Sequence, residues 1–161
     1  RRWPPQRFAA VGDALAGRGL RVVVTGSAAE AGLARAVCAA MRHPAIDLSG
    51  RTPAVWTLGA LVERAALVVA NDTGISHIAA ALRTPSAIVA SGSDVARWAP
   101  LDRTRHRVLW HAVACRPCAH AVCPTAHECA AGVSADAVIA CALALLEAFR
   151  PCQTPVADSA S

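Results

Sequence analysis

Apolar residues along this chain alternate between helical spacing and short unbroken runs of strand length. Helical spacing covers residues 5–18, 28–42, 53–64, 75–82 and 134–149. The unbroken runs, which predict buried strands, are 21–25, 67–70, 86–90 and 107–110, with a weaker one at 45–48. Strands that are apolar throughout and separated by helices predict a parallel sheet covered on both faces. With right-handed crossovers, the pattern predicts a doubly wound α/β domain.

The length and composition fit one domain. The chain has 161 residues, of which 55% are hydrophobic and 17% charged, enough apolar content to build a core. We expect the domain to cover residues 1–150, including a Cys-rich loop at 115–129, and to be followed by a polar tail at 151–161. Because the chain starts with Arg1 and no strand precedes the first helix, we expect it to be part of a longer protein whose N-terminal domain is absent.

The net charge of +5 comes from arginine, since the chain has no lysine. Scattered arginines fit a solvated basic surface, or attraction to acidic substrates or to an anionic membrane surface. Aromatic residues make up only 4%, and no basic and aromatic residues interleave, so a nucleic-acid partner is not expected. The first 20 residues lack the order of a signal peptide, and seven cysteines without an export signal favour a reducing compartment. We expect a cytoplasmic protein.

Three small polar loops follow the predicted strands. They are Gly26–Ser27, residues 71–74 and residues 91–94. In an open α/β sheet, ligands bind outside the carboxyl ends of the strands, and a ligand's phosphates can approach small residues closely. These loops are therefore the candidate binding site.

The middle loop carries the most chemistry. Thr73 is expected to cap the following helix, and Gly74 leaves room for an anion at the first-turn amides. Asp72 would repel a phosphate, so we expect it to accept hydrogen bonds from sugar hydroxyls. His77 is expected to face the same opening and to donate to a phosphate or hydroxyl oxygen. The same residues also fit a purely structural cap with a surface histidine, and spacing alone leaves both interpretations open.

The surrounding sequence resembles a known family. The run NDTGISHIAAALRTPSAIVASGSD, at residues 71–94, resembles the signature of glycosyltransferase family 9, with its D-[ST]-G-x-x-H core, small-residue helix and Thr-Pro before a strand and glycine loop. The opening Arg-Arg-Trp-Pro resembles the basic-x-Trp-Pro segment of that family, and residues 26–30 resemble its glycine–acid loop. The resemblance covers about residues 1–145.

The resemblance implies a Rossmann-like C-terminal half of a two-domain GT-B glycosyltransferase, which holds the sugar donor. Glu30 would accept hydrogen bonds from the ribose, and Arg1 takes the place of a family lysine near the phosphates. Arginine keeps that charge but offers a planar fork of donors. The residues expected to bind the donor are Asp72, Thr73, Gly74, His77, Glu30, Arg1, Gly26, Ser27 and Gly92.

The implied donor is ADP-heptose or a similar nucleotide sugar. The implied acceptor is the lipopolysaccharide inner core, of the lipid A–Kdo type, reached through the absent domain, with peripheral contact at the inner membrane. No cofactor is expected, and transfer would be metal-independent, since no Asp-x-Asp pair is present. The general base is expected in the absent domain, so this chain alone should not transfer sugar. Two alternatives remain: a non-catalytic nucleotide-sugar-binding module, or a Cys-rich metal-binding interaction domain.

A cysteine cluster, Cys115, Cys118, Cys123 and Cys129, is the second unusual feature. Its spacing fits a structural Zn²⁺ site, a redox-labile disulfide or a set of reduced structural thiols, and the sequence does not choose among them. Trp56 and Trp98 are expected to pack in the interior, with the alternative that one of them lines a nucleotide pocket.

Overall fold

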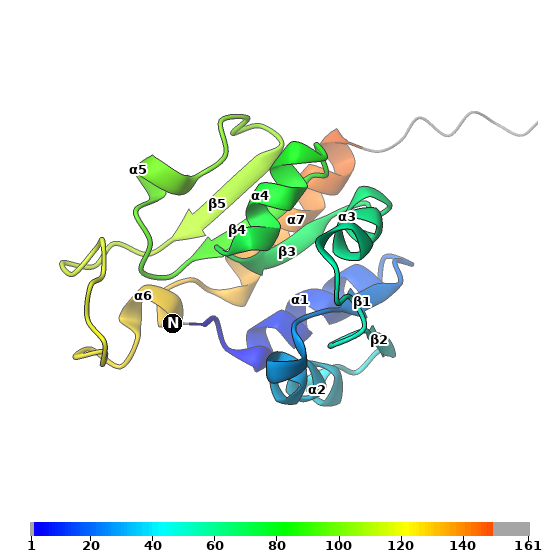
Figure 1. Ribbon diagram of the computed structural model, residues 1–161, viewed down its shortest axis with the longest axis horizontal. Helices are drawn as coiled ribbons and strands as arrows, with labels where there is room; N and C mark the ends of the chain where they lie inside the picture. The colour runs from blue at the N-terminus through cyan, green and yellow to red at the C-terminus, as the bar shows by residue number, and fades with distance from the viewer. Residues whose placement is uncertain (1, 150–161) are drawn as a thin grey trace, which may run out of the picture.

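Helices and strands alternate along residues 2–149, which are the residues that the computed structural model describes (Figure 1). The helices are α1 (Pro5–Ala16), α2 (Ala31–Ala40), α3 (Val55–Glu63), α4 (Gly74–Ala81), α5 (Val95–Trp98), α6 (Glu128–Ala131) and α7 (Ala135–Ala148), with a 3-10 helix, η1, at Ala28–Glu30. The strands are β1 (Val22–Val24), β2 (Ala45–Asp47), β3 (Val68–Asn71), β4 (Ser86–Ala90) and β5 (His106–Trp110). The expected tail at 151–161 lies outside the described residues.

The α/β class with parallel strands is confirmed, and every predicted helix and strand is present. Two helices of four residues each, α5 and α6, are not predicted by the pattern. The single helix expected over 28–42 is divided into η1 and α2. None of the helices within residues 2–149 combines the length and apolar character that crossing a membrane requires.

Backbone hydrogen bonds divide the strands into two parallel sheets. β1 pairs with β2, and β4 lies between β3 and β5. β1 and β3 line opposite parts of one cavity and do not share a hydrogen-bonded ladder. From β1 the chain crosses to β2, whereas from β3 it crosses to β4 and then β5, so strand order reverses between β1 and β3. In doubly wound folds this reversal marks where ligands bind.

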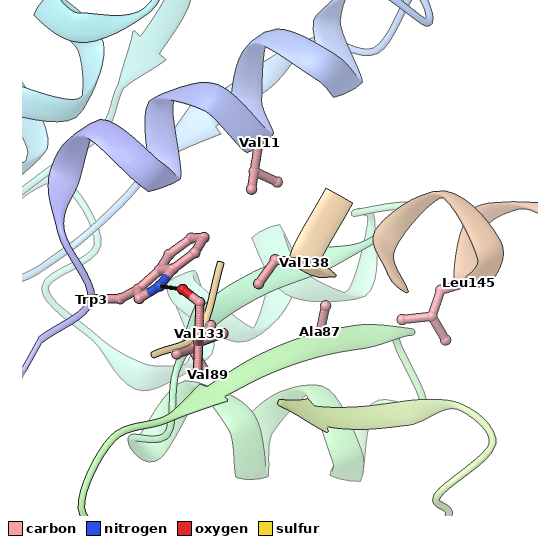
Figure 2. Close-up of a cluster of buried hydrophobic side chains, with 7 residues drawn as sticks. All are labelled: Trp3, Val11, Ala87, Val89, Val133, Val138 and Leu145. Atoms are coloured by element: carbon pink, nitrogen blue, oxygen red, sulfur yellow. Dashed lines mark hydrogen bonds between the residues drawn. The ribbon is translucent and has the colours of Figure 1, made fainter. Parts of the chain in front are cut away.

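β4 is buried along its whole length because helices cover both faces of its sheet. Ala87 and Val89 join a core formed with α1 and α7 (Figure 2). On the other face α3 and α4 pack together over β3, around the buried side chains of Val62, Val68 and Ala79. Because successive side chains of a strand point to opposite faces, a strand covered on both sides must be apolar throughout. This arrangement explains the unbroken apolar runs.

Trp3 anchors the N-terminal segment across the fold. Its side chain is 1% exposed, and the indole Nε1 donates to the carbonyl oxygen of Val133 at 2.8 Å (Figure 2). Its backbone N–H donates to Oδ1 of Asn71, the last residue of β3, at 3.0 Å. The ring packs edge-on against Phe8. These contacts place the preceding residue, Arg2, beside the carboxyl end of β3.

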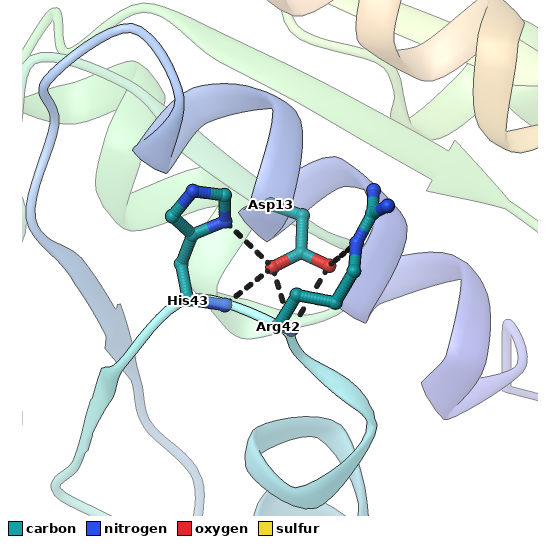
Figure 3. A network of polar contacts seen from close by, with 3 residues as sticks. All are labelled: Asp13, Arg42 and His43. Carbon is teal, nitrogen blue, oxygen red and sulfur yellow. Dashed lines mark hydrogen bonds and ion pairs between the residues drawn. The ribbon is translucent and has the colours of Figure 1, made fainter.

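Asp13 joins α1 to the segment that follows α2 (Figure 3). Its carboxylate is 6% exposed and accepts the backbone N–H groups of Arg42 and His43, both at 2.9 Å. The Arg42 Nε and the His43 Nδ1 lie 3.3 and 3.2 Å from the same carboxylate. A buried carboxylate is stable here because every neighbour offers it a hydrogen.

Candidate functional site

A cavity of about 1620 Å³ opens at the carboxyl ends of β1, β3 and β4. All three loops predicted as the binding site contribute to its wall. The loop residues that line it are Gly26, Ser27, Glu30, Asn71, Asp72, Thr73, Ser91, Gly92, Ser93 and Asp94. The cavity continues between β1 and β3, where its wall is aliphatic. The sequence-predicted loops are therefore neighbours in space.

Asp72, at the junction of β3 and α4, is held by the loop that follows β4. The Ser93 hydroxyl donates to its Oδ2, whereas the Ser76 hydroxyl, in α4, lies 3.4 Å from its Oδ1 and donates to the Thr73 carbonyl oxygen at 2.7 Å. The Asp72 backbone N–H donates to the carbonyl oxygen of Val89, which continues the β3–β4 ladder. The carboxylate is half-buried at the cavity wall and keeps lone pairs for further donors. Ser93 lies in the predicted loop at 91–94, where no role was assigned to it, and it orients a residue to which a role was assigned.

The first turn of α4 is open to the outside. Thr73 occupies the N-cap position, but its hydroxyl accepts no hydrogen bond from the helix and instead lies 3.4 Å from the carbonyl oxygen of Asn71. The prediction that its side chain caps the helix is therefore wrong. An added Cβ at Gly74 would meet no atom within 4 Å. Of the first-turn amides, that of Ser76 already donates to the Thr73 carbonyl oxygen at 2.9 Å, so an anion would meet the amides of Gly74 and Ile75, where the helix dipole favours it.

His77 lies at the edge of the cavity rather than in its wall. Its exposed ring stands edge-on to Trp98, with centroids 6.3 Å apart, and Trp98 itself lines the cavity. Trp98 is 48% exposed, and the Arg97 guanidinium lies 5.0 Å from the centre of its ring. Trp56 is 78% exposed. The expectation that both tryptophans pack in the interior is wrong, because both stand on exposed helix faces.

Glu30 faces the cavity from the β1 side. Its Oε2 accepts the backbone N–H and the hydroxyl of Ser27, at 3.0 and 2.8 Å, and its Oε1 pairs with Arg2 at 3.1 Å. The Ser27 backbone N–H, followed by the Ser27 hydroxyl, lowers the pKa of the Glu30 carboxyl, and Arg2 adds to this effect. An added Cβ at Gly26 would lie 3.3 Å from the Glu30 Cβ, a tight contact that would require Glu30 to shift slightly.

The basic residue at this wall is Arg2. Arg1, which the resemblance assigned to the phosphates, lies outside the described residues. Arg2 lines the cavity and its Nη2 is the partner of Glu30. The signal that could have identified it is Trp3, since a buried tryptophan fixes the register of the residues beside it.

Arg116 fixes the loop that follows β4. Its guanidinium donates to the carbonyl oxygens of Ser93 at 2.7 Å, Ser91 at 2.6 Å and Ala90 at 3.0 Å, and it stacks 5.2 Å from the Trp110 ring. Sequence reasoning missed Arg116, because its partners in the loop after β4 are 23–26 residues away in the chain.

The predicted glycine of this loop, Gly92, lines the cavity, and its carbonyl oxygen accepts the Cys118 N–H at 2.8 Å. The Cys-rich segment thus covers one wall of the site.

The four clustered cysteines are not arranged as a metal site. Within residues 2–149 no three His, Cys, Asp or Glu side chains are grouped to hold a metal ion. The Cys123 sulfur has its own partners: it accepts the His127 N–H at 3.1 Å and lies 3.8 Å from the Thr125 hydroxyl. Of the described cysteines, none is in a disulfide.

Comparisons with known proteins identify the family of this chain. A model of glycosyltransferase family 9 (heptosyltransferase) matches residues 1–128. The lipopolysaccharide heptosyltransferase 3 of Escherichia coli is 32% identical over 100 residues, and that of strain K12 is 34% identical over 101 residues. Each match covers 61% of this chain and 29% of the relative, so the matched region spans less than a third of those proteins.

Two solved structures share the fold. The glycosyl transferase family 9 protein of Veillonella parvula DSM 2008 superposes with a TM-score of 0.81 at 23% identity, over 92% of this chain and 42% of that one. The E. coli ADP-heptose lps heptosyltransferase II superposes with a TM-score of 0.77 at 24% identity, over 91% and 42%. These likenesses support the fold, and the family model matches well over half of the residues: the chain belongs to glycosyltransferase family 9.

Proposed function

We propose that this chain is the donor-binding half of a glycosyltransferase that moves a heptose, or a related sugar, from an ADP-activated donor to the lipopolysaccharide inner core. The observation that carries the proposal is the single cavity that three polar loops line where strand order reverses, beside the uncapped first turn of α4. Family membership and the heptosyltransferase relatives support the choice of sugar and acceptor.

The diphosphate of the donor would lie on the first turn of α4. Gly74 leaves space there, and the amides of Gly74 and Ile75, with the helix dipole, would attract its charge. Transfer breaks the anomeric C–O bond and leaves negative charge on the diphosphate, so the same amides would stabilise the departing group. Each preorganised donor of this kind contributes on the order of 3 kcal/mol to the transition state. Arg2 and Arg97 line the cavity and add positive charge.

The sugar would lie against Asp72, whose carboxylate Ser93 holds in place. His77, at the cavity edge, would donate to a sugar or phosphate oxygen. Glu30 would bind the ribose. Because Arg2 and Ser27 already occupy both Glu30 oxygens, ribose hydroxyls would join or displace these partners.

The acceptor and the general base would come from another domain of the same protein. Transfer needs both substrates held across a closing cleft, and one wall of a cleft supplies only part of that positioning. The acceptor of the lipid A–Kdo type would bring the protein to the cytoplasmic face of the inner membrane. We expect this chain to bind donor without transferring sugar.

Isothermal calorimetry of this chain with ADP, ADP-heptose, UDP and GDP tests the proposal. The expected result is binding of ADP and tighter binding of ADP-heptose, because the sugar adds contacts to Asp72 and His77. UDP and GDP share the diphosphate and control for the base, and we expect weaker binding of both. Absence of binding for all four ligands would contradict the proposal. Equal affinity for ADP and ADP-heptose would contradict the proposed contacts of the sugar with Asp72 and His77.

A further inference from the structure

The turn between Cys115 and Cys118 lies directly on the loop that follows β4. Arg116, between the two cysteines, donates to the carbonyl oxygens of Ser91 and Ser93, and the Cys118 N–H donates to that of Gly92. Two residues of the turn, Arg116 and Cys118, therefore hold three successive residues of the cavity wall. Any bond that stiffens this turn acts on the loop beneath it.

The two thiols of the turn already contact each other. The Arg116 N–H donates to the Val113 carbonyl oxygen at 3.2 Å and closes the backbone turn. Burial raises the pKa of the Cys115 thiol, and its hydrogen bond with Cys118 raises the pKa further. Cys118 lines the cavity and is half-buried. Cys123 is held by His127 and Thr125 instead.

We propose that Cys115 and Cys118 form a reversible disulfide that clamps the loop at residues 91–94, by exchange with a small disulfide of the glutathione class. The Cys118 thiolate attacks one sulfur of the small disulfide, forms a mixed disulfide and releases one thiolate. The Cys115 thiolate then displaces the second. Two cysteine thiols are oxidised to one disulfide, the small disulfide is reduced to two thiols, and the two protons pass to the departing thiolates.

Closing the bond fixes Arg116 on the loop. In the reduced state, which is the one seen here, hydrogen bonds alone hold the turn on the loop that carries Ser93, the donor to Asp72. The disulfide would add a covalent restraint to this arrangement and so limit movement of Ser93 away from Asp72. This consequence for ligand binding rests on the proposed function, whereas formation of the disulfide does not.

Thiol counting in glutathione buffers tests the disulfide. The chain is equilibrated with oxidised or reduced glutathione, alkylated, and its mass measured; oxidation should remove two alkylatable thiols. Cys115→Ser and Cys118→Ser should each abolish that loss. Cys123→Ser, from the same segment, and Cys38→Ser, from α2, are matched controls and should still lose two.

Fragmentation of the oxidised wild-type peptide identifies the bond without any variant, so a variant that fails to fold does not decide the matter. A bond between Cys115 and Cys118 supports the proposal. A bond between Cys115 and Cys129, or no loss of thiols in oxidised glutathione, would overturn it. Treatment with reduced glutathione must restore both thiols; a bond that persists contradicts reversibility.

Calorimetry with ADP in the two buffers tests the clamp. We expect oxidised wild type to bind ADP about fivefold more tightly than reduced wild type, a typical size for coupling between two sites. Cys115→Ser should bind like reduced wild type in both buffers. Equal affinities in wild type with the disulfide formed would overturn the clamp. If ADP binds in neither buffer, the proposed donor site is contradicted. The proposed disulfide is then tested by the thiol count alone.

Discussion

The carboxylate of Asp13 shows how one side chain can tie two helices together. Burial alone would raise the pKa of Asp13, but hydrogen bonds from the backbone and side chains of His43 and Arg42 outweigh it and lower the pKa to about 2. The folded state therefore favours the ionised form of Asp13 more than the unfolded chain does, where the pKa of an aspartate is about 3.9.

The Asp13 carboxylate makes the stability of the folded state depend on pH. Because the folded pKa lies below the unfolded one, the contribution of Asp13 is fully present above about pH 4 and is lost as pH falls towards 2. Asp13→Asn should lower the melting temperature at pH 7, and the gap to wild type should narrow between pH 4 and 2. Thermal melts across this range measure it. Asp136→Asn, at an exposed position of α7, should follow the wild-type pH profile. A constant gap for Asp13→Asn would contradict the account.

Some residues of the site could be predicted from the sequence and others could not. Asp72, Gly26, Ser27 and Gly92 were predicted at the site and line one cavity, because residues at strand ends are placed by the strands themselves. Arg116 was not predicted, since its hydrogen bonds depend on the path of a long loop. Local sequence likewise does not reveal that the Thr73 hydroxyl turns to Asn71, nor that His77 meets Trp98.

At the scale of elements, apolar runs predicted the strands well. β4 was predicted with the bounds observed, since burial on both faces demands an unbroken apolar run. The four-residue helices α5 and α6 are too short to show a helical period. The separation of β1–β2 from β3–β5 was not predictable, because β1 and β2 have only three residues each and their pairing partners leave no trace in the pattern.

Trp3 links elements that lie far apart in the sequence, and replacing it should lower the free energy of unfolding. Trp3→Phe deletes the Nε1 donor to Val133 and leaves space in the core, so we expect unfolding free energy to fall by about 2 kcal/mol. Trp56→Phe, on the exposed face of α3, is the matched control and should stay within about 0.5 kcal/mol of wild type. Urea denaturation followed by circular dichroism measures both. Similar losses in the two variants would show that Trp3 is not the link between α1 and the segment before α7.

At the scale of the whole molecule, the two sheets and the reversal of strand order produce the cavity. Glu30, which follows β1, Asp72, at the end of β3, and the loop after β4 all line that one cavity. Arg2 reaches the same place because Trp3 pins the first residues across the end of β3. Thr73 and Ile75, at the start of α4, line it as well, and there the donor diphosphate is proposed to bind.

A pair of glycine substitutions tests that placement most directly. At both Gly74, in α4, and Gly32, in α2, an added Cβ would meet no atom within 4 Å, and alanine favours a helix over glycine, so both variants should fold. By calorimetry, Gly74→Ala should weaken ADP binding at least about tenfold, about 1.4 kcal/mol, because the methyl group stands where the diphosphate approaches. Gly32→Ala should bind ADP like wild type. Wild-type affinity in Gly74→Ala would contradict a diphosphate on the first turn of α4.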